Sequence, residues 1–235
     1  MGDPTITNID NGVAILNDAV YIDALLALAG ADVIALGTIL ARREVSSTIA
    51  DGVAVAEDTG DGVCDACALY GNIVVPKIGD YVLTCTAEVA NGGVWSLEDP
   101  NGVEILSGIT MDAGAGNTTI FNSAGLGFTF SLTDGAEDFD TGDTFTITIT
   151  ADGDVVPFSP TGVGGAQFAR YVLDYEVEVL AQADVAVRVI QSGTVNSEKL
   201  VVDGGGTVTT AILEMLRDYK IDAKPITELN GLDNQ

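Results

Sequence analysis

The chain has 235 residues, of which 47% are hydrophobic, and its 9 Lys and Arg against 35 Asp and Glu give a formal net charge of −26 at pH 7. This length allows one large core or two modest ones, and the hydrophobic content excludes disorder throughout. A chain this acidic repels phosphate backbones and anionic lipids, so the composition predicts neither a nucleic-acid partner nor a membrane partner. The same charge suits a soluble protein displayed at high density, or one that works in salty water.

The composition also argues against catalysis. Histidine is absent, which removes the commonest general base and the commonest transition-metal ligand. The glycine-rich stretches 162–165 and 204–206 lack the Lys-Ser/Thr ending of a phosphate-binding loop. We therefore predict that the chain is not an enzyme and holds no cofactor. A histidine-free hydrolase that uses acidic pairs such as Asp138 and Asp140 stays open as an alternative.

Two further absences bear on the cellular compartment. The sequence has no apolar run of about 18 residues, as an ordinary membrane-spanning helix requires. Residues 1–4 are acidic and include no basic residue, so no secretory signal is visible. We therefore expect the chain to be made and folded in a cytoplasm.

The first part of the chain carries apolar runs with few clear turns. Residues 8–20 are expected to form an arm with one short strand. The stretch 21–30 is compatible with a helix ended by Gly30 or with a strand. Residues 33–42 are rich in β-formers, with Gly37 marking a bulge or kink, and 49–55 predict a turn and a further strand.

The sequence of the middle of the chain predicts short strands bounded by turn residues. Stretches 127–132 and 143–150 alternate apolar and polar residues, which is typical of an antiparallel sandwich with one buried face per sheet. We assign the single Trp95 to its core and not to a sugar-stacking platform. The other expected strands in this part are 63–70, 81–87, 94–98 and 103–106.

The last part returns to longer apolar runs, with strands expected within 171–180 and 185–190. One good helix follows, capped by Thr209 or Thr210, with Lys220 at its C-terminal end, where a cation suits the helix dipole. Its apolar face is expected to hold Ile212, Leu213, Leu216 and Tyr219. Residues 225–235 are interpreted as a tail.

Together these elements predict a mainly β protein with two domains. Residues 1–56 and 152–235 form a discontinuous, β-rich anchor domain with one C-terminal helix. Residues 57–151 form an inserted antiparallel β-sandwich. Insertion is tolerated where chain ends lie close together at a surface, and such a layout is typical of a protein that anchors one domain and displays the other.

Cys64-Asp65-Ala66-Cys67 has the C-x-x-C spacing of redox and zinc motifs. The surrounding residues predict an extended strand, in which residues three apart point to opposite faces, so we do not expect the two thiols to converge. We therefore predict no metal site here and interpret the cysteines as packed free thiols. An approach of Cys85 to either thiol from a neighbouring strand stays open.

Two acidic segments, 58–61 and 138–143, could offer hard oxygen ligands to calcium. Neither has the spacing of an EF-hand loop. We interpret both as turns between strands.

Short motifs in the middle of the chain resemble a β-module of tailed-phage virion proteins, and motifs in the flanks resemble the head decoration protein family of tailed phages, typified by the lambda decoration protein. The module motifs are Gly60-Asp61-Gly62, Gly79-Asp80-Tyr81-Val82-Leu83-Thr84-Cys85, Trp95-Ser96-Leu97-Glu98-Asp99-Pro100-Asn101-Gly102, Phe128-Thr129-Phe130-Ser131-Leu132-Thr133-Asp134-Gly135 and Phe139-Asp140-Thr141-Gly142-Asp143-Thr144-Phe145-Thr146-Ile147. The flank motifs are Gly37-Thr38-Ile39-Leu40-Ala41-Arg42, Gly165-Ala166-Gln167, Val185-Ala186-Val187-Arg188-Val189-Ile190-Gln191-Ser192-Gly193 and the terminal helix. The resemblance covers most of the chain, which departs from the family in its longer N-terminal segment and its acidity.

The resemblance implies a virion protein without catalytic activity, made in the host cytoplasm and seated on the capsid exterior. It implies a homotrimer at local three-fold positions that binds the major capsid protein, with an Ig-like sandwich facing outward. Its N-terminal arm would touch the shell, which points to Thr5, Ile6, Thr7 and Ile9 as capsid-contact residues that could add a strand to a sheet edge. The alternative is a host-surface or glycan-binding module of a phage tail or fibre protein, with the inserted domain holding the glycan.

Overall fold

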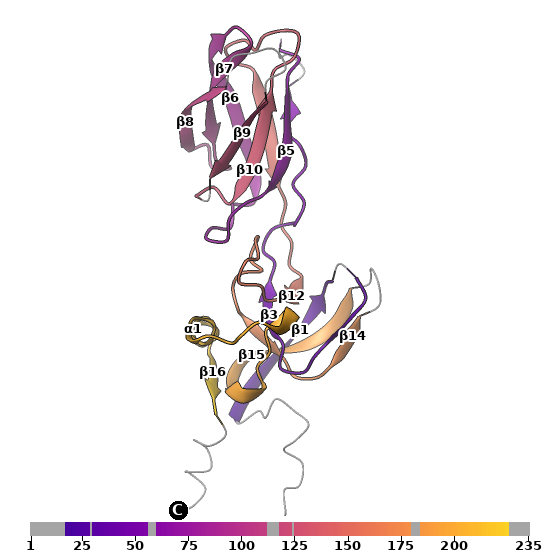
Figure 1. Ribbon diagram of the computed structural model, residues 1–235. Coiled ribbons are helices and arrows are strands. Elements are labelled where there is room, and N and C mark those ends of the chain that lie inside the picture. Colours follow the sequence, from indigo (N-terminus) through magenta and orange to yellow (C-terminus); the bar gives the residue numbers. More distant parts are fainter. Residues whose placement is uncertain are drawn as a thin grey trace, which may run out of the picture. The chain divides into compact units, whose positions relative to one another are not determined.

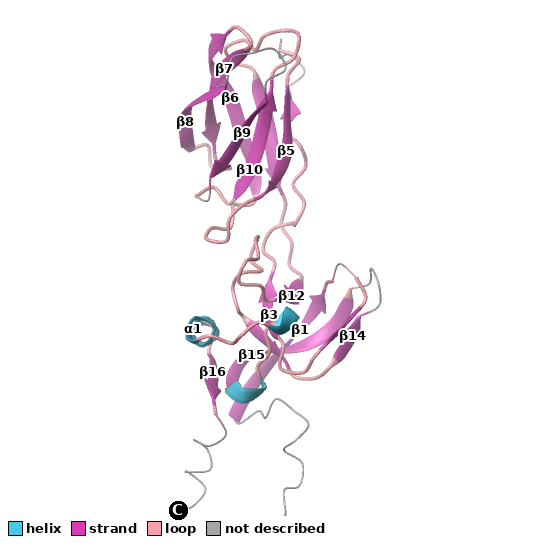
Figure 2. Cartoon of the chain, viewed as in Figure 1, coloured by secondary structure: helices cyan, strands magenta, loops and turns pink. Residues whose placement is uncertain are grey.

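The computed structural model describes residues 17–28, 30–55, 60–111, 118–123, 125–179 and 184–225 (Figure 1). These residues are mainly β, with a single α-helix near the C-terminus, as the sequence predicts (Figure 2). Two short 3-10 turns, η1 (Ser197–Lys199) and η2 (Asp203–Gly205), precede that helix. Within the described ranges, no helix has the length and apolar character needed to cross a membrane.

The chain divides into two compact units. Unit one comprises Met1–Arg43 and Gly153–Gln235, as far as these residues are described, and unit two comprises Glu44–Asp152. The first boundary therefore lies before Glu44 and not at residue 57, where the sequence analysis put it. The reason is packing: Val45 and Ile49 are buried in the core of unit two, and the strand that follows them pairs there.

Unit one is built around a six-stranded sheet to which both ends of the chain contribute. Its strands, in spatial order, are β1 (Asn17–Leu26), β12 (Val155–Pro157), β3 (Ile39–Arg42), β13 (Tyr171–Leu173), β15 (Val185–Asn196) and β16 (Ile221–Lys224). Because β1 also pairs with β15, the first five strands form a closed ring in which each strand pairs with two neighbours. A separate two-stranded ladder joins β2 (Asp32–Ile34) to β14 (Val177–Val179).

The ambiguous stretch 21–30 is resolved by these long-range pairings. It supplies most of β1, whose residues from Tyr21 to Leu26 pair in antiparallel register with β15. Leu26 also pairs with Val155, and the N–H of Ala27 donates to the Val155 carbonyl at 3.0 Å. Local sequence could not distinguish helix from strand here, because partners more than 100 positions away decide it.

The strands of unit one bury residues on both faces. Leu40 packs in one apolar cluster, whereas its neighbours Ile39 and Ala41 pack in another. The second cluster includes Ile212 and Leu216 of the predicted helix, α1 (Thr210–Asp218). The predicted cap is confirmed, since the Thr209 hydroxyl accepts a hydrogen bond from the Ile212 N–H at 3.4 Å.

Unit two is an antiparallel sandwich. One sheet contains, in order, β4 (Val53–Ala54), β11 (Thr144–Ile149), β6 (Gly79–Val89), β7 (Gly92–Glu98) and β8 (Glu104–Met111). The other contains β5 (Val63–Leu69), β10 (Phe128–Thr133) and β9 (Thr118–Ser123). Every pairing within these sheets is antiparallel.

An aromatic cluster fills the sandwich core. Trp95 is 0% exposed, with ring centroids 4.9 Å from Phe139 in an edge-on arrangement and 5.7 Å from Phe145. Such pairs add to the stabilisation from apolar burial. The assignment of Trp95 to the core is therefore confirmed.

Candidate functional site

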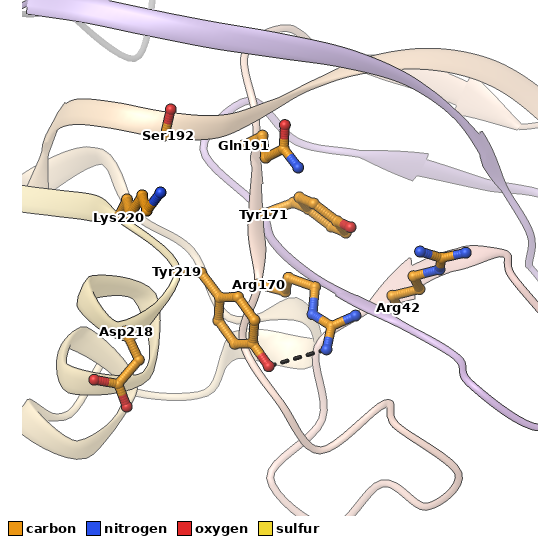
Figure 3. Close-up of a pocket in the computed structure, with 8 residues that line it drawn as sticks. All are labelled: Arg42, Arg170, Tyr171, Gln191, Ser192, Asp218, Tyr219 and Lys220. Atoms are coloured by element: carbon orange, nitrogen blue, oxygen red, sulfur yellow. Dashed lines mark hydrogen bonds between the residues drawn. The ribbon is translucent and has the colours of Figure 1, made fainter.

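Unit one carries a cavity of about 450 Å³ in which basic and aromatic side chains meet (Figure 3). We call it the basic pocket and define it by Arg42, Arg170, Tyr171, Gln191, Ser192, Asp218, Tyr219 and Lys220. Arg42 ends β3, Arg170 comes directly before β13 and Tyr171 begins it, and Gln191 and Ser192 belong to β15. Asp218 is the last residue of α1, and Tyr219 and Lys220 follow it. The sheet order brings these separate segments together, because β3, β13 and β15 are neighbours.

The end of α1 places Lys220 at the pocket. Tyr219 is the C-cap of the helix, and the next residue, Lys220, has φ +67°, the left-handed conformation that usually falls to glycine. The Lys220 carbonyl accepts a hydrogen bond from the Gly193 N–H at 3.0 Å, and β16 starts at Ile221. The chain therefore turns sharply at Lys220 to join β15, and this turn fixes the position of the lysine.

Arg170 is held against Tyr219. Its guanidinium carbon lies 4.6 Å from the centroid of the Tyr219 ring, and its Nη2 donates to the Tyr219 hydroxyl at 2.9 Å (Figure 3). A cation over a tyrosine ring gains about 0.5–1 kcal/mol at an exposed site. The stacking and the hydrogen bond together restrict the guanidinium to one region of the pocket.

The pocket gathers an unusual share of the positive charge of this chain. Three of its 9 Lys and Arg residues line the pocket. The one carboxylate in the lining belongs to Asp218, and Figure 3 shows it turned away from Arg42 and Arg170. The arrangement can therefore attract and orient an anionic group.

Four other cations of the chain have carboxylate partners. Arg43 pairs with Asp154 at 3.2 Å and Lys224 with Asp222 at 2.8 Å. Lys77 pairs with Asp99, and Arg217 with Glu214. Across the described parts of the chain, by contrast, neither Arg42 nor Lys220 forms an ion pair. In a protein with 35 acidic residues, two such cations at one pocket are notable.

This pocket was not predicted from the sequence. The residues predicted to contact a capsid, Thr5, Ile6, Thr7 and Ile9, lie outside the described residues. Lys220 was noted only as a cation at a helix end, and Arg42 and Arg170 were not singled out. The scarcity of Lys and Arg was a usable signal, but only the neighbouring positions of β3 and β13 bring the two arginines together.

The two cysteines of the C-x-x-C motif do converge, so the expectation that they point to opposite faces was wrong. The pairing of β5 with β10 shifts register between Thr129 and Ser131, and Ala66 has φ +50°. An extra residue in β5 therefore forms a β-bulge, which returns Cys67 to the core face occupied by Cys64. The two thiols are 2% and 8% exposed and hydrogen-bond to each other.

This hydrogen bond separates the acidities of the two thiols. The bond from Cys64 lowers the pKa of the Cys67 thiol, and the same bond raises the pKa of the Cys64 thiol. Burial raises the pKa of the third thiol, Cys85. All three cysteines are free and buried.

The acidic segments that could have bound calcium make turn contacts. The Asp143 carboxylate accepts the N–H groups of Gly60 at 3.1 Å and Asp140 at 2.9 Å, and the Asp61 carboxylate accepts the Glu137 N–H at 2.8 Å. Asp58 and Thr59 lie outside the described residues. In the part of the chain that the structure covers, no group of three or more His, Cys, Asp or Glu is arranged to hold a metal ion.

Comparison of the chain with family models, with curated proteins and with solved structures finds no match.

Proposed function

We propose that the chain is a structural virion protein of a tailed phage that binds the outer surface of the icosahedral capsid. In this proposal it acts as a trimer, contacts the major capsid protein and presents the β-sandwich outward. It has no catalytic role, and it joins the particle after synthesis in the host cytoplasm. The family resemblance of the flanks and of the central module is the source of these details.

The observation that carries the proposal is the shared sheet of unit one. The strands β1 and β3 come before the sandwich in the sequence, whereas β12, β13, β15 and β16 come after it. All six pair in one sheet, so the sandwich is an insertion into a finished unit. This is the layout that the resemblance to head decoration proteins implies, with one unit that anchors and one that is displayed.

The charge of the chain fits a coat of many copies. A net charge of −26 per chain keeps densely displayed proteins from clumping at moderate salt. A protein that binds the assembled shell but not its loosened form stabilises the shell by mass action. Many weak contacts around a shell then add up to firm attachment.

Co-sedimentation with capsid shells tests the proposal. Purified chain is mixed with expanded, undecorated shells of the phage that encodes it, and the pellet is assayed for a saturating number of copies. Shells already carrying the protein serve as the control and should take up little more. Absence of the chain from the pellet at every ratio would contradict the proposal.

The alternative, a glycan-binding module of a tail or fibre, has less support from unit two. Sugar sites commonly use exposed aromatic faces, yet Trp95 is fully buried. In the described part of unit two, Tyr70, at 40%, is the one aromatic side chain that is strongly exposed. Specific binding of the intact chain on a glycan array would favour the alternative.

A further inference from the structure

We propose that the basic pocket binds the carboxylates of an acidic peptide segment on a partner protein. The proposal goes beyond attachment to a capsid and stands independently of it, because it concerns only the chemistry of unit one. It rests on three properties of the pocket: the charges of Arg42 and Lys220, which have no ion-pair partner among the described residues, the restrained guanidinium of Arg170, and the position of the pocket in the fold.

The charge calls for an anion. Arg42 and Lys220 face the pocket without an ion-pair partner among the residues that the structure describes, and Arg170 adds a third cation. Arginine binds carboxylates through two parallel N–H donors, which gives direction as well as charge. A segment with more than one carboxylate could use Arg42 and Lys220 together.

One of the three cations, Arg170, is held in place before any ligand arrives. Arg170 is stacked on Tyr219 and bonded to its hydroxyl, so little side-chain entropy remains to be lost on binding. Lys220 occupies a left-handed position that glycine would fill with less strain. A side chain kept at such a position is an indication of function.

The position favours carboxylates over phosphate. The pocket lies at the C-terminal end of α1, where the negative end of the helix dipole opposes a dianionic phosphate more strongly than a singly charged carboxylate. Phosphates are commonly bound instead by backbone N–H groups at helix N-termini. Figure 3 shows Lys220 on one side of the pocket and Arg42 on the other, with the Tyr171 ring between them. Charges spread in this way suit an extended segment better than one compact dianion. A nucleic acid is disfavoured because the rest of the chain would repel it.

Calorimetric titration of the full-length protein at low ionic strength tests the proposal. The probes are the blocked peptide acetyl-Glu-Glu-Glu-amide, its neutral counterpart acetyl-Gln-Gln-Gln-amide and inorganic phosphate. We expect saturable binding of the glutamate peptide, weakened by added salt. We expect no saturable binding of the glutamine peptide and weaker binding of phosphate.

Charge-matched variants locate the site. Arg42→Gln and Lys220→Gln each remove one pocket cation, and Lys199→Gln removes an exposed cation of η1 that does not line the pocket. Each pocket variant should lower the affinity for the glutamate peptide about two- to fivefold, which is the contribution expected of one exposed ion pair. The Lys199 variant should bind as the wild type does. Circular dichroism checks that each variant is folded, and Arg42, an exposed residue, gives a second reading if the Lys220 variant is unstable.

Three results would overturn the proposal. The first is equal affinity in the pocket variants and the Lys199 variant, which would show attraction without a site. The second is equal binding of the glutamine peptide, and the third is tighter binding of phosphate. Failure of the chain to bind capsid shells would not affect the outcome of the peptide titration, so each proposal can be contradicted without the other.

Discussion

Arg43 and Asp154 are joined twice: the Arg43 N–H donates to the Asp154 carbonyl at 2.9 Å, and the Arg43 guanidinium lies 3.2 Å from the Asp154 carboxylate. These two residues flank Glu44–Asp152, the whole of unit two. Within unit two, the Asp152 N–H donates to the Glu44 carbonyl at 3.1 Å. The chain therefore leaves unit one and returns to it at adjacent points, and β3 and β12 pair as though they formed a hairpin.

Because the chain leaves unit one and returns to it at adjacent points, we predict that unit one folds without unit two. Replacing residues 44–153 by Asn-Gly, a favoured two-residue hairpin turn, should leave β3 and β12 paired, because Arg42 opposes Val155 in antiparallel register and the new turn then joins Arg43 directly to Asp154. We expect a dispersed amide NMR spectrum and cooperative unfolding. An Asn-Gly variant that is collapsed and unfolds without cooperativity would contradict the closure.

The class of fold could be predicted from the sequence, but the strand pairings could not. Period-two alternation in β10 and β11 predicts the sandwich, and Thr209 with the apolar face behind it predicts α1. Residues 44–55 were wrongly assigned to the anchor domain. Packing decides which unit a residue belongs to, and Val45 and Ile49 are buried in the core of unit two. Local patterns report local geometry, whereas a domain boundary depends on distant contacts.

The candidate site shows the same limit. The C-x-x-C thiols were expected to diverge because strand periodicity assumes no extra residue, and the bulge at Ala66 breaks that assumption. Arg42 and Arg170 are 128 positions apart in the sequence. Nothing local marks them as neighbours, since only the pairing of β3 with β13 brings them together.

The convergence of Cys64 and Cys67 predicts a selective cross-link. Mild oxidation with diamide should join these two thiols, because they already hydrogen-bond and Cys67 has the lowered pKa. Mass spectrometry of the denatured, alkylated protein should show two thiols lost and Cys85 alkylated. Cys85→Ala should cross-link as the wild type does and Cys67→Ala should not. A link that instead involves Cys85 would contradict the bulge geometry.

Tyr21 predicts a stability loss at high pH. Burial, together with a 2.8 Å hydrogen bond from its hydroxyl to Asp174, raises the pKa of Tyr21 from 10.0 to about 12. The folded state thus keeps a proton that the unfolded state releases. The resulting stabilisation is complete below pH 10 and is lost as the pH rises towards 12.

Urea denaturation of the wild type and Tyr21→Phe across this range measures the effect. The stability difference between the two proteins should shrink from pH 10 to pH 12. Tyr70→Phe, which removes an exposed hydroxyl in unit two, is the control. A difference that does not change with pH would show that the hydroxyl titrates normally.

We expect that replacing Lys220 by glycine makes unit one more stable but weakens binding of the acidic peptide. Lys220→Gly should raise the free energy of unfolding of unit one by about 1 kcal/mol, because glycine adopts a left-handed conformation without the strain of a Cβ. Lys220→Ala keeps the Cβ and should give no such gain. Both variants should bind the glutamate peptide more weakly than wild type. Equal stability of the glycine and alanine variants in urea denaturation would contradict the strain argument.

The most direct test of the proposed role is a cryo-EM map of the particles produced by the phage that encodes this chain. The account predicts three copies of unit one around each local three-fold position, touching the major capsid protein from outside, with sandwich density beyond them. Bare three-fold positions, or the chain found only in the tail or its fibres, would contradict it.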